Sequence, residues 1–357
     1  MKTYRVGVLG CGQIAQIMHL PYLHDLPGWK IHSLCDLSAE VVSKVAEKYG
    51  IDPDHCYTDY DQFLKDGELD VVLICSKDHC EPAVKAAQAG KHIFVEKPFG
   101  FNRKQAQAMV DAAKLAGVKL MVGYMKRYDT GFEELQKLVQ EMEDISLVRF
   151  HDYGGSFAYT REVYDVLSGS DVDPSVFAEG KQQCNSAMLE EIGEDRAQLL
   201  PAYSLLLGVF CHDAILMRHL FGNNLEVLFT DVYGGFANSV LKAGNTRIIV
   251  ESGLVMARHN WDEYIEIYSP KKNVRLEFPW PYLKNAPSLL KISDHVPGST
   301  MVRESVISTS FEEAYRREWQ HFYRCLEEDR QPLTNGEDAF EDIALLSKII
   351  KTVKAGV

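Results

Sequence analysis

Basic residues are scarce relative to acidic ones in this chain of 357 residues. There are 38 Lys and Arg against 51 Asp and Glu, which gives a formal net charge of -13. Binding to nucleic acid or to an anionic membrane surface requires clustered Lys and Arg, so this balance argues against both partners. No apolar stretch approaches the ~20 residues of a membrane helix, and no apolar signal region follows Met1. We therefore expect a cytoplasmic protein.

Several motifs of other enzyme classes are also missing. The eight cysteines include no C-x-x-C pair, and several stand in apolar runs such as 72–75, so we expect reduced, buried thiols. No group of His and Cys residues has the spacing of a zinc site, and we expect no metal. No Gly-x-Ser-x-Gly segment indicates a nucleophilic hydrolase. Hydrophobic residues make up 46% of the chain, enough for a full core.

The first third of the chain alternates between strand and helix patterns. Short apolar runs predict strands at 4–9, 30–35, 71–75, 91–95 and 118–122. Helices are expected at 14–20 (stopping near Pro21), 39–49, 59–64, 81–89 and 103–116. Buried strands that alternate with helices are typical of a parallel, doubly wound α/β sheet. We assign residues 1–124 to such a Rossmann domain.

The pattern changes after about residue 126. Helices are expected at 132–142, 205–220, 312–328 and 338–354, and strands at 146–153, 225–234, 246–256, 262–268 and 273–277. Residues 156–200 are polar and irregular, and we predict loops and short helices there. Residues 125–357 are therefore expected to form an α+β domain with a large, mostly antiparallel open sheet for substrate binding and oligomerisation. Its C-terminal helices could pack back on the first domain.

The segment Gly10-Cys11-Gly12-Gln13-Ile14-Ala15 joins the first strand to a helix. Gly10 permits a tight turn, Gly12 lets the backbone approach a pyrophosphate, and the helix N-terminus offers free N–H groups. Asp36 ends the second strand, where a carboxylate accepts hydrogen bonds from ribose hydroxyls and repels a 2′-phosphate. Leu37 follows where NADP enzymes often carry Arg. This context predicts NAD; the alternative is a plain turn with a surface acid.

A second motif, Glu96-Lys97-Pro98, closes the fifth strand and places Lys97 at the carboxyl edge of the sheet. Together with other segments it resembles the Gfo/Idh/MocA family of glucose–fructose oxidoreductases, inositol dehydrogenases and related sugar dehydrogenases. The resemblance covers nearly the whole chain except about 156–200. Its further motifs are His79, Ala89-Gly90-Lys91-His92, Gly123-Tyr124-Met125-Lys126-Arg127-Tyr128-Asp129, His212-Asp213 and Arg218-His219-Leu220-Phe221-Gly222.

The resemblance implies roles for individual residues. Lys97 would contact cofactor and substrate and help to move the proton, and His212 would be the second catalytic residue, an imidazole that titrates near neutrality. Arg127, Tyr153, Lys97 and His212 are the expected substrate-binding residues. The expected cofactor-binding residues are Gly10, Gly12, Gln13, Ile14, Asp36, Cys75, Ser76, His79, Glu96 and Lys97. The family also implies a homodimer or homotetramer.

Some of these roles have structural alternatives. Arg127 could serve a domain interface instead, and Trp261, Trp280 and Tyr282 could either stack on a sugar ring or pack in the core.

One position departs from the family pattern. Many family dehydrogenases carry an Asp one helical turn before the histidine, where this chain has Gly208, and the acid that often follows is replaced by Ile215. Only Asp213 remains beside His212. Either another acid substitutes, with Glu190, Glu191 and Asp195 as the candidates, or the chemistry has diverged.

Three functions therefore stay open. The first is an NAD-dependent dehydrogenase that oxidises a secondary hydroxyl of a sugar, sugar derivative or cyclitol. The second is an enzyme that retains NAD and uses transient sugar oxidation for glycoside cleavage or elimination. The third is an NAD-binding sensor with a degraded active site, which the departure at Gly208 alone supports.

Overall fold

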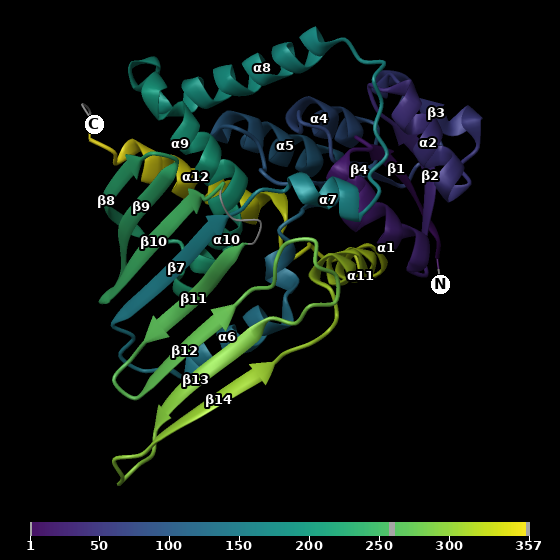
Figure 1. Ribbon diagram of the computed structural model, residues 1–357. Coiled ribbons are helices and arrows are strands. Elements are labelled where there is room, and N and C mark those ends of the chain that lie inside the picture. Colours follow the sequence, from purple (N-terminus) through teal and green to yellow (C-terminus); the bar gives the residue numbers. More distant parts are fainter. Residues whose placement is uncertain (1, 257–260, 355–357) are drawn as a thin grey trace. The chain divides into compact units, whose positions relative to one another are not determined.

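The computed structural model describes residues 2–256 and 261–354 (Figure 1). It divides into two compact units. Unit 1 comprises Met1–Gly123, Ala158–Glu191 and Glu318–Ile343, and unit 2 comprises Tyr124–Phe157, Ile192–Arg317 and Ala344–Val357. Two segments from beyond residue 124 therefore belong to the first unit. The C-terminal helices α11 (Ala314–Glu327) and α12 (Gly336–Lys351) each contribute residues to both units.

Unit 1 contains a parallel sheet of six strands in the order β3-β2-β1-β4-β5-β6. Its strands are β1 (Tyr4–Leu9), β2 (Trp29–Cys35), β3 (Cys56–Tyr57), β4 (Val71–Ile74), β5 (His92–Val95) and β6 (Leu120–Val122). This order is that of dinucleotide-binding folds, in which the crevice lies where the strand order reverses, between β1 and β4. The predicted doubly wound sheet is confirmed.

The helices of unit 1 begin and end largely where capping residues predict. Ser38 Oγ accepts a hydrogen bond from Val41 N at 3.1 Å, and Gly50 ends the same helix with a φ of 66°. The helical segments are η1 (Ala15–His19), α1 (Leu20–Asp25), α2 (Ala39–Tyr49), η2 (Pro53–His55), α3 (Tyr60–Phe63), α4 (Cys80–Gln88), α5 (Arg103–Ala116), α7 (Ala158–Val163) and α8 (Pro174–Ile192).

Two helix predictions in unit 1 are wrong. The first helix does not stop near Pro21, because a π-helical stretch, η1, continues into α1 and the missing N–H of proline falls at the join. Residues 156–200 contain a helix of 19 residues, α8, rather than only loops and short helices. Its first half is exposed and its second half buries Cys184, Ala187 and Met188, so no apolar stripe runs along its whole length.

Unit 2 contains an eight-stranded sheet in the order β14-β13-β12-β11-β7-β10-β9-β8, in which every pair is antiparallel except β7 and β10. The strands are β7 (Leu147–Gly154), β8 (Glu226–Tyr233), β9 (Phe236–Ala243), β10 (Thr246–Leu254), β11 (Asp262–Tyr268), β12 (Lys272–Glu277), β13 (Leu289–His295) and β14 (Val302–Ser308). The mostly antiparallel sheet is confirmed, although sequence patterns missed β9, β13 and β14.

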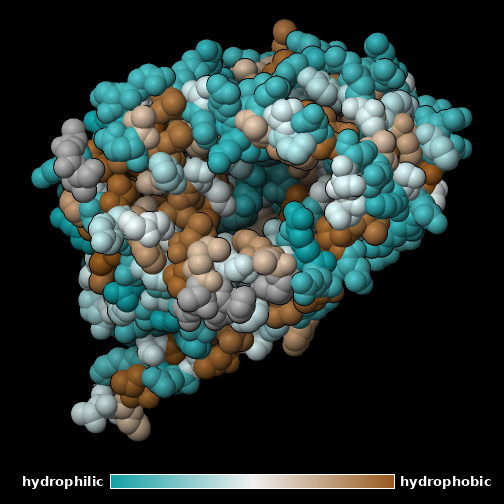
Figure 2. Space-filling view, turned by 45° about the horizontal axis from the view of Figure 1, so that its top comes forward, coloured by the Kyte–Doolittle hydropathy of each residue, from teal (hydrophilic) through white to brown (hydrophobic). Residues whose placement is uncertain are grey.

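The helical segments of unit 2 are η3 (Met125–Tyr128), α6 (Thr130–Glu141), η4 (Glu194–Leu199), α9 (Leu200–Leu205), η5 (Leu206–Phe210) and α10 (Cys211–Phe221). The run Glu194–Phe221 is long and apolar enough to cross a membrane by length and composition, which corrects the expectation that no such stretch exists. However, 72% of its apolar window is buried, as in the core helix of a globular fold. On the face shown in Figure 2, hydrophobic residues are interspersed with hydrophilic ones.

All eight cysteines, which lie in the described part of the chain, are free thiols. Five of them are buried as expected, whereas Cys56, Cys75 and Cys80 are only partly buried.

Candidate functional site

The glycine loop leaves β1 where the sheet of unit 1 reverses its strand order. Gly10 has a φ of 90°, and a Cβ there would lie 2.5 Å from the backbone nitrogen of Ser76 at the end of β4. Only glycine fits this turn. Gly12 is different, because a Cβ there would meet no atom within 4 Å. Its missing side chain therefore leaves open space at the N-terminus of η1, where a pyrophosphate would lie.

Asp36 is held in place beside this loop by backbone donors. Its two carboxylate oxygens accept hydrogen bonds from Cys11 N at 2.8 Å and from Ser38 N at 3.0 Å. The carboxylate is thereby oriented at the end of β2 and keeps further acceptor sites for a ligand. The residues present therefore fit a dinucleotide with its ribose next to Asp36.

A cavity of about 400 Å³ opens over the crevice, a size typical of ligand pockets. One wall comes from the strand ends and includes Gly10, Gly12, Asp36 and Ser76. Another part of the lining comes from the exposed half of α8. It includes Val176 and Phe177, whose surfaces are 39% and 60% exposed. Together with Leu37, these side chains form an apolar surface on which an adenine could pack.

The N-terminal part of the segment that carries α8 is hydrogen-bonded to helices of the Rossmann domain. Gln16 donates from Nε2 to the carbonyl of Leu167 at 2.9 Å and accepts from Leu167 N at 2.8 Å. Asp171 accepts hydrogen bonds from the Ser38 hydroxyl and from Glu40 N, at the N-terminus of α2. Residues 158–173 are thus fixed to η1 and α2.

The C-terminal end of the segment is bound to the N-terminus of α5 by hydrogen bonds and an ion pair. Glu191 accepts from the backbone nitrogen and Nε of Arg103 at 3.0 and 2.9 Å, and Glu190 pairs with Lys104 at 2.7 Å. Carboxylates are favourable at a helix N-terminus. Both acids are thereby engaged at the N-terminus of α5 within unit 1.

Two other residues of the glycine loop are half-buried, Gln13 and Ile14. The side chain of Gln13 donates to Thr160 Oγ1 at 2.5 Å, which ties α7 to the loop. Gln13 therefore contacts α7 through its side chain, while its predicted contact with the cofactor stays a prediction.

Glu96, at the end of β5, is the centre of a buried hydrogen-bonded chain. Trp319 Nε1 donates to His19 Nδ1 at 3.1 Å, so His19 carries its hydrogen on Nε2 and donates to Glu96 Oε1 at 2.8 Å. The second carboxylate oxygen accepts from Lys97 N at 3.0 Å. Burial raises the pKa of Glu96, but His19 and Lys97 lower it below its usual value.

The neighbouring predicted residues surround the same strand end. His79 begins α4 and donates from Nδ1 to the carbonyl of Pro98 at 2.8 Å, after the cis peptide bond Lys97–Pro98. Burial lowers the pKa of His79, which favours the neutral ring. Cys75 and Ser76 line the cavity described above. Lys97 is half-buried and follows Glu96 at the end of β5, on the carboxyl edge of the same sheet. The structure thus gathers the predicted cofactor residues at one edge of the sheet.

In unit 2, His212 lies on α10 with its ring 6.2 Å from that of Tyr124, in an edge-to-face arrangement. Gly208 stands in the π-helical segment η5, one turn earlier, and a Cβ there would meet no atom within 4 Å. Position 208 is exposed and a Cβ there would be unobstructed, but this chain has no side chain at that position.

A buried cluster of charged side chains includes Asp213, the residue that follows His212 in the chain. Its members are Asp213 on α10, Asp152 on β7, Glu263 on β11 and Lys126 on η3, all at most 5% exposed. Asp152 and Glu263 are register partners on adjacent strands. Lys126 pairs with Glu263, and Trp261 Nε1 donates to Asp152 at 2.6 Å. The three carboxylates are close enough to hold a metal ion, but Lys126 already supplies a cation in contact with them.

The protonation states of the cluster follow from its burial. Burial raises the pKa of Glu263 to about 8, although Lys126 lowers it in part. Burial and the charges of Glu263 and Asp152 raise the pKa of Asp213 well above its usual value. Burial lowers the pKa of Lys126, but the carboxylates around it outweigh this effect and raise it overall. At neutral pH the cluster therefore retains Lys126 as a cation together with at least one carboxyl proton.

Comparison with known proteins agrees with the geometry of unit 1. Residues 4–124 match the family model described as the oxidoreductase family with an NAD-binding Rossmann fold. Residues 4–124 are thus similar to the Rossmann domain of the Gfo/Idh/MocA oxidoreductase family. The cofactor predicted from Gly10, Gly12 and Asp36 is confirmed at the level of this family.

Individual relatives match over the same part of the chain. An uncharacterized oxidoreductase of Bacillus subtilis is 31% identical over 144 residues, 40% of this chain and 41% of that protein. The myo-inositol 2-dehydrogenase of Thermotoga maritima is 31% identical over 138 residues, 38% of this chain and 40% of that protein. The chain thus matches about two fifths of the length of these family members.

Solved structures extend the likeness of fold to the whole chain. A 3-ketoreductase from Actinomadura kijaniata in complex with NADP has a TM-score of 0.75 at 16% identity, covering 99% of this chain and 98% of that one. The aldose–aldose oxidoreductase from Caulobacter crescentus has a TM-score of 0.74 at 20% identity, covering 100% and 99%. At these identities the likeness establishes a shared fold.

Two of the four predicted substrate-binding residues, Arg127 and Tyr153, have protein neighbours within unit 2. Arg127 is buried within unit 2, with its guanidinium 5.4 Å from the ring of Phe132 and Nη1 3.3 Å from Gln136 Oε1 on α6. Tyr153 alternates with Asp152 along β7 and lies on the half-exposed face of the sheet, next to His151. Their contact with a substrate stays a prediction.

Sequence reasoning did not single out Asp152, Glu263 or the role of Lys126. A signal was present, because Asp152 continues the buried alternation of Val148 and Phe150 along β7, and Glu263 falls on the buried face with Ile265. A charged residue at a core-facing strand position requires a partner.

The raised pKa of Glu263 predicts a pH dependence of stability. A carboxyl group whose pKa rises from 4.5 to about 8 on folding binds protons more strongly in the folded state. Its contribution is fully present below about pH 4.5 and is lost as the pH rises to about 8. We expect Glu263→Gln to flatten the decline in melting temperature over that interval, measured by thermal denaturation. Glu226→Gln, at an exposed position on β8, is the control; an identical slope in all three proteins would contradict the assignment.

Proposed function

We propose that this protein is an NAD-dependent oxidoreductase that oxidises a secondary hydroxyl of a sugar, sugar derivative or cyclitol. The observation that carries the proposal is the cofactor crevice of unit 1, with Lys97 placed at its carboxyl edge by the buried chain through Glu96. When bound, NAD would accept the hydride from the alcohol carbon. The names of the inositol dehydrogenase and aldose oxidoreductase relatives agree with a polyol or sugar as substrate.

The protein must then accept the proton that the hydroxyl releases. Lys97 and His212 are the residues proposed for this task, because an amine and an imidazole can both hold and pass on a proton near neutral pH. Lys97 is positioned by the hydrogen bond of its backbone to Glu96, and His212 is followed by the ionic cluster around Asp213. The cluster would fix α10 and store a proton in place of the acid missing at Gly208.

The preference for NAD over NADP is part of the proposal and rests on Asp36. The carboxylate is oriented by Cys11 N and Ser38 N and lines the cavity together with Leu37. A 2′-phosphate would meet this negative charge, whereas ribose hydroxyls can donate hydrogen bonds to it.

Loss of Lys97 should affect turnover more than cofactor binding. We expect Lys97→Ala to lower kcat by about 10²–10⁴-fold, the range for removal of a general acid–base group, with little change in NAD affinity. The measurements are NADH formation with a panel of cyclitols and sugars, and fluorescence titration with NADH. Lys65→Ala, an exposed lysine of the same unit, is the control. Failure of the wild type on the whole panel with NAD bound would count against a dehydrogenase.

Removal of the charge at Asp36 should relax cofactor selectivity. In Asp36→Asn the amide oxygen can still accept a backbone hydrogen bond, so the loop is retained while the charge is lost. We expect the ratio of NADP to NAD affinity to rise by at least about tenfold, the equivalent of one charge-assisted hydrogen bond. Titration with NADH and NADPH tests this, with the exposed Asp25→Asn as control. An unchanged ratio would remove the basis for NAD selectivity.

A second candidate function is favoured by α8 and the segment that carries it. This strap, residues 158–191, is anchored at η1, α2 and α5 and lines the cofactor cavity with Val176 and Phe177. A dinucleotide bound in the cavity would contact it. The arrangement fits an enzyme that retains NAD and uses it for transient sugar oxidation. Release of product from glycosides without added cofactor would distinguish this function from a dehydrogenase.

Phe177 should control how long NAD stays bound. Stacking of a base on an aromatic side chain is worth about 1–3 kcal/mol, so we expect Phe177→Ala to speed NAD dissociation by about 5- to 150-fold. Stopped-flow displacement of NADH measures this rate. Leu115→Ala, at a position 92% exposed on α5, is the matched control. Equal rates in the wild type and in Phe177→Ala would show that the strap does not hold the adenine.

A further inference from the structure

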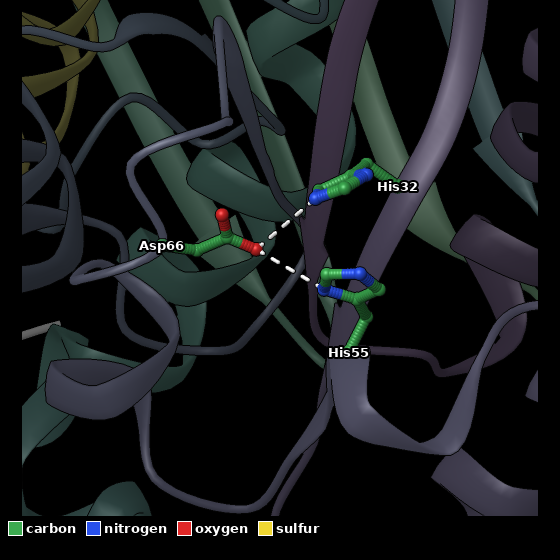
Figure 3. Close-up of side chains that lie close together, drawn as sticks. All are labelled: His32, His55 and Asp66. Atoms are coloured by element: carbon green, nitrogen blue, oxygen red, sulfur yellow. Dashed lines mark ion pairs between the residues drawn. The ribbon is translucent and has the colours of Figure 1, made fainter.

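A second cluster of polar side chains lies in unit 1. His32 on β2, His55 at the end of η2 and Asp66 after α3 converge on one point, as Figure 3 shows. His32 Nε2 and His55 Nδ1 lie 3.3 and 3.5 Å from the same atom, Asp66 Oδ2. The side chains of His32 and Asp66 are only 5% and 6% exposed, while that of His55 is 35% exposed and gives access from solvent.

The three converging atoms have no hydrogen-bond partner among the described residues. Their separations exceed the 2.7–3.2 Å of an N–H···O hydrogen bond. Buried polar atoms are nearly always satisfied by protein, water or an ion, so three unsatisfied atoms facing one point require an explanation. Two ligand atoms about 2.0–2.1 Å from a tetrahedral zinc ion are about 3.3–3.4 Å apart, which matches the spacing observed.

The backbone and the surrounding groups orient these side chains. The register between β1 and β2 shifts at His32, so that Val6 pairs with Ile31 and Gly7 pairs with Ser33, and His32 has no partner on β1. Such bulges re-aim a side chain. Asp66 Oδ1 accepts a hydrogen bond from Glu68 N at 3.0 Å, which leaves Oδ2 directed at the two rings. Carboxylates that bind metals are commonly held by a hydrogen bond of this kind.

We propose that His32, His55 and Asp66 bind a divalent transition-metal ion, with Zn²⁺ as the ion that two imidazoles and one carboxylate select best. Mg²⁺ and Ca²⁺ prefer oxygen ligands throughout, and imidazole nitrogens favour the later first-row metals. Glu68 Oε2 lies 3.8 Å from His32 Nε2, but it is also bound to Arg5 at 2.8 Å. The fourth position therefore belongs to water or to Glu68 after a small movement.

The ion would have a structural role. It would join β2, which ends at Cys35 just before Asp36, to η2 and to the connection after α3. His55 directly precedes the two-residue edge strand β3, so the ion would also fix this edge of the sheet. The inference does not depend on the reaction proposed above.

Zinc binding by the full-length, EDTA-treated protein tests the proposal. Competition with a chromophoric chelator should show one equivalent of Zn²⁺ per chain, and Zn²⁺ should raise the melting temperature because a ligand of the folded state stabilises it. His55→Gln and Asp66→Asn should each weaken binding by at least about tenfold, the lower limit found even for residues that only orient metal ligands. His55→Gln is the primary variant because its partly exposed side chain makes misfolding a small risk.

Two controls separate this site from other zinc ligands. His24→Gln removes an exposed histidine of the same unit, and Cys56→Ser removes the thiol next to His55; both should bind zinc as the wild type does. A Co²⁺ complex should show the visible bands of tetrahedral coordination without thiolate charge transfer. The proposal is overturned if the wild type takes up no equivalent, or if His55→Gln and Asp66→Asn bind as tightly as the wild type.

Discussion

The hydrogen bond between His19 and Glu96 is the constraint on which the cofactor unit depends most directly. It joins the helix that follows the glycine loop to the strand end that carries Lys97, and Trp319 from α11 fixes the tautomer of the histidine that makes it. A buried carboxylate without such partners would take up a proton or lose its position. Here its pKa is lowered instead, because His19 and the neighbouring Lys97 favour the ionised form. The loop that receives the cofactor and the lysine at the strand end are therefore placed by one buried chain of three side chains.

Local features of the sequence predicted the parts of the fold that local physics determines. Ser38 and Gly50 begin and end α2 as capping residues do, and the buried valines of β1 and β4 specify a parallel sheet. The predicted helix end near Pro21 was wrong because the π-helical segment η1 runs directly into α1. The proline, which lacks an N–H donor, then falls at the start of α1, and residue type alone does not indicate this arrangement. The sequence patterns did not predict helix α8 for a different reason. Its exposed half faces the cofactor cavity, so its apolar residues Val176 and Phe177 stand outside the periodic stripe that marks a core-facing helix.

In the candidate site, too, residues that belong to local motifs were predicted and residues brought together by the tertiary structure were not. Gly10, Asp36 and Lys97 were predicted from motifs, because backbone contact with a phosphate and the carboxyl edge of a sheet impose short-range requirements on sequence. The residues of the buried cluster in unit 2 come from four separate elements; they are Lys126, Asp152, Asp213 and Glu263. Their only signal in the sequence is that the strand patterns of β7 and β11 place charged residues at core-facing positions. His32, His55 and Asp66 show no metal spacing in the sequence, since a bulge in β2 and two short helices bring them together. Motif spacing detects ligands on one element, and it is insensitive to ligands that tertiary structure assembles.

The departure at Gly208 and the buried cluster of unit 2 differ in their exposure to solvent. Position 208 on η5 is exposed, so an acid there would be solvated, whereas Asp213 on α10 is fully buried beside Asp152 and Glu263. Lys126 pairs with Glu263, and burial raises the pKa values of Glu263 and Asp213, so the cluster holds a proton at neutral pH. A solvated acid at position 208 would not add to this buried charge. The protonation of Asp213, next to His212 in the chain, therefore follows from its burial and from the charges of Glu263, Asp152 and Lys126, and it does not require a particular residue at position 208.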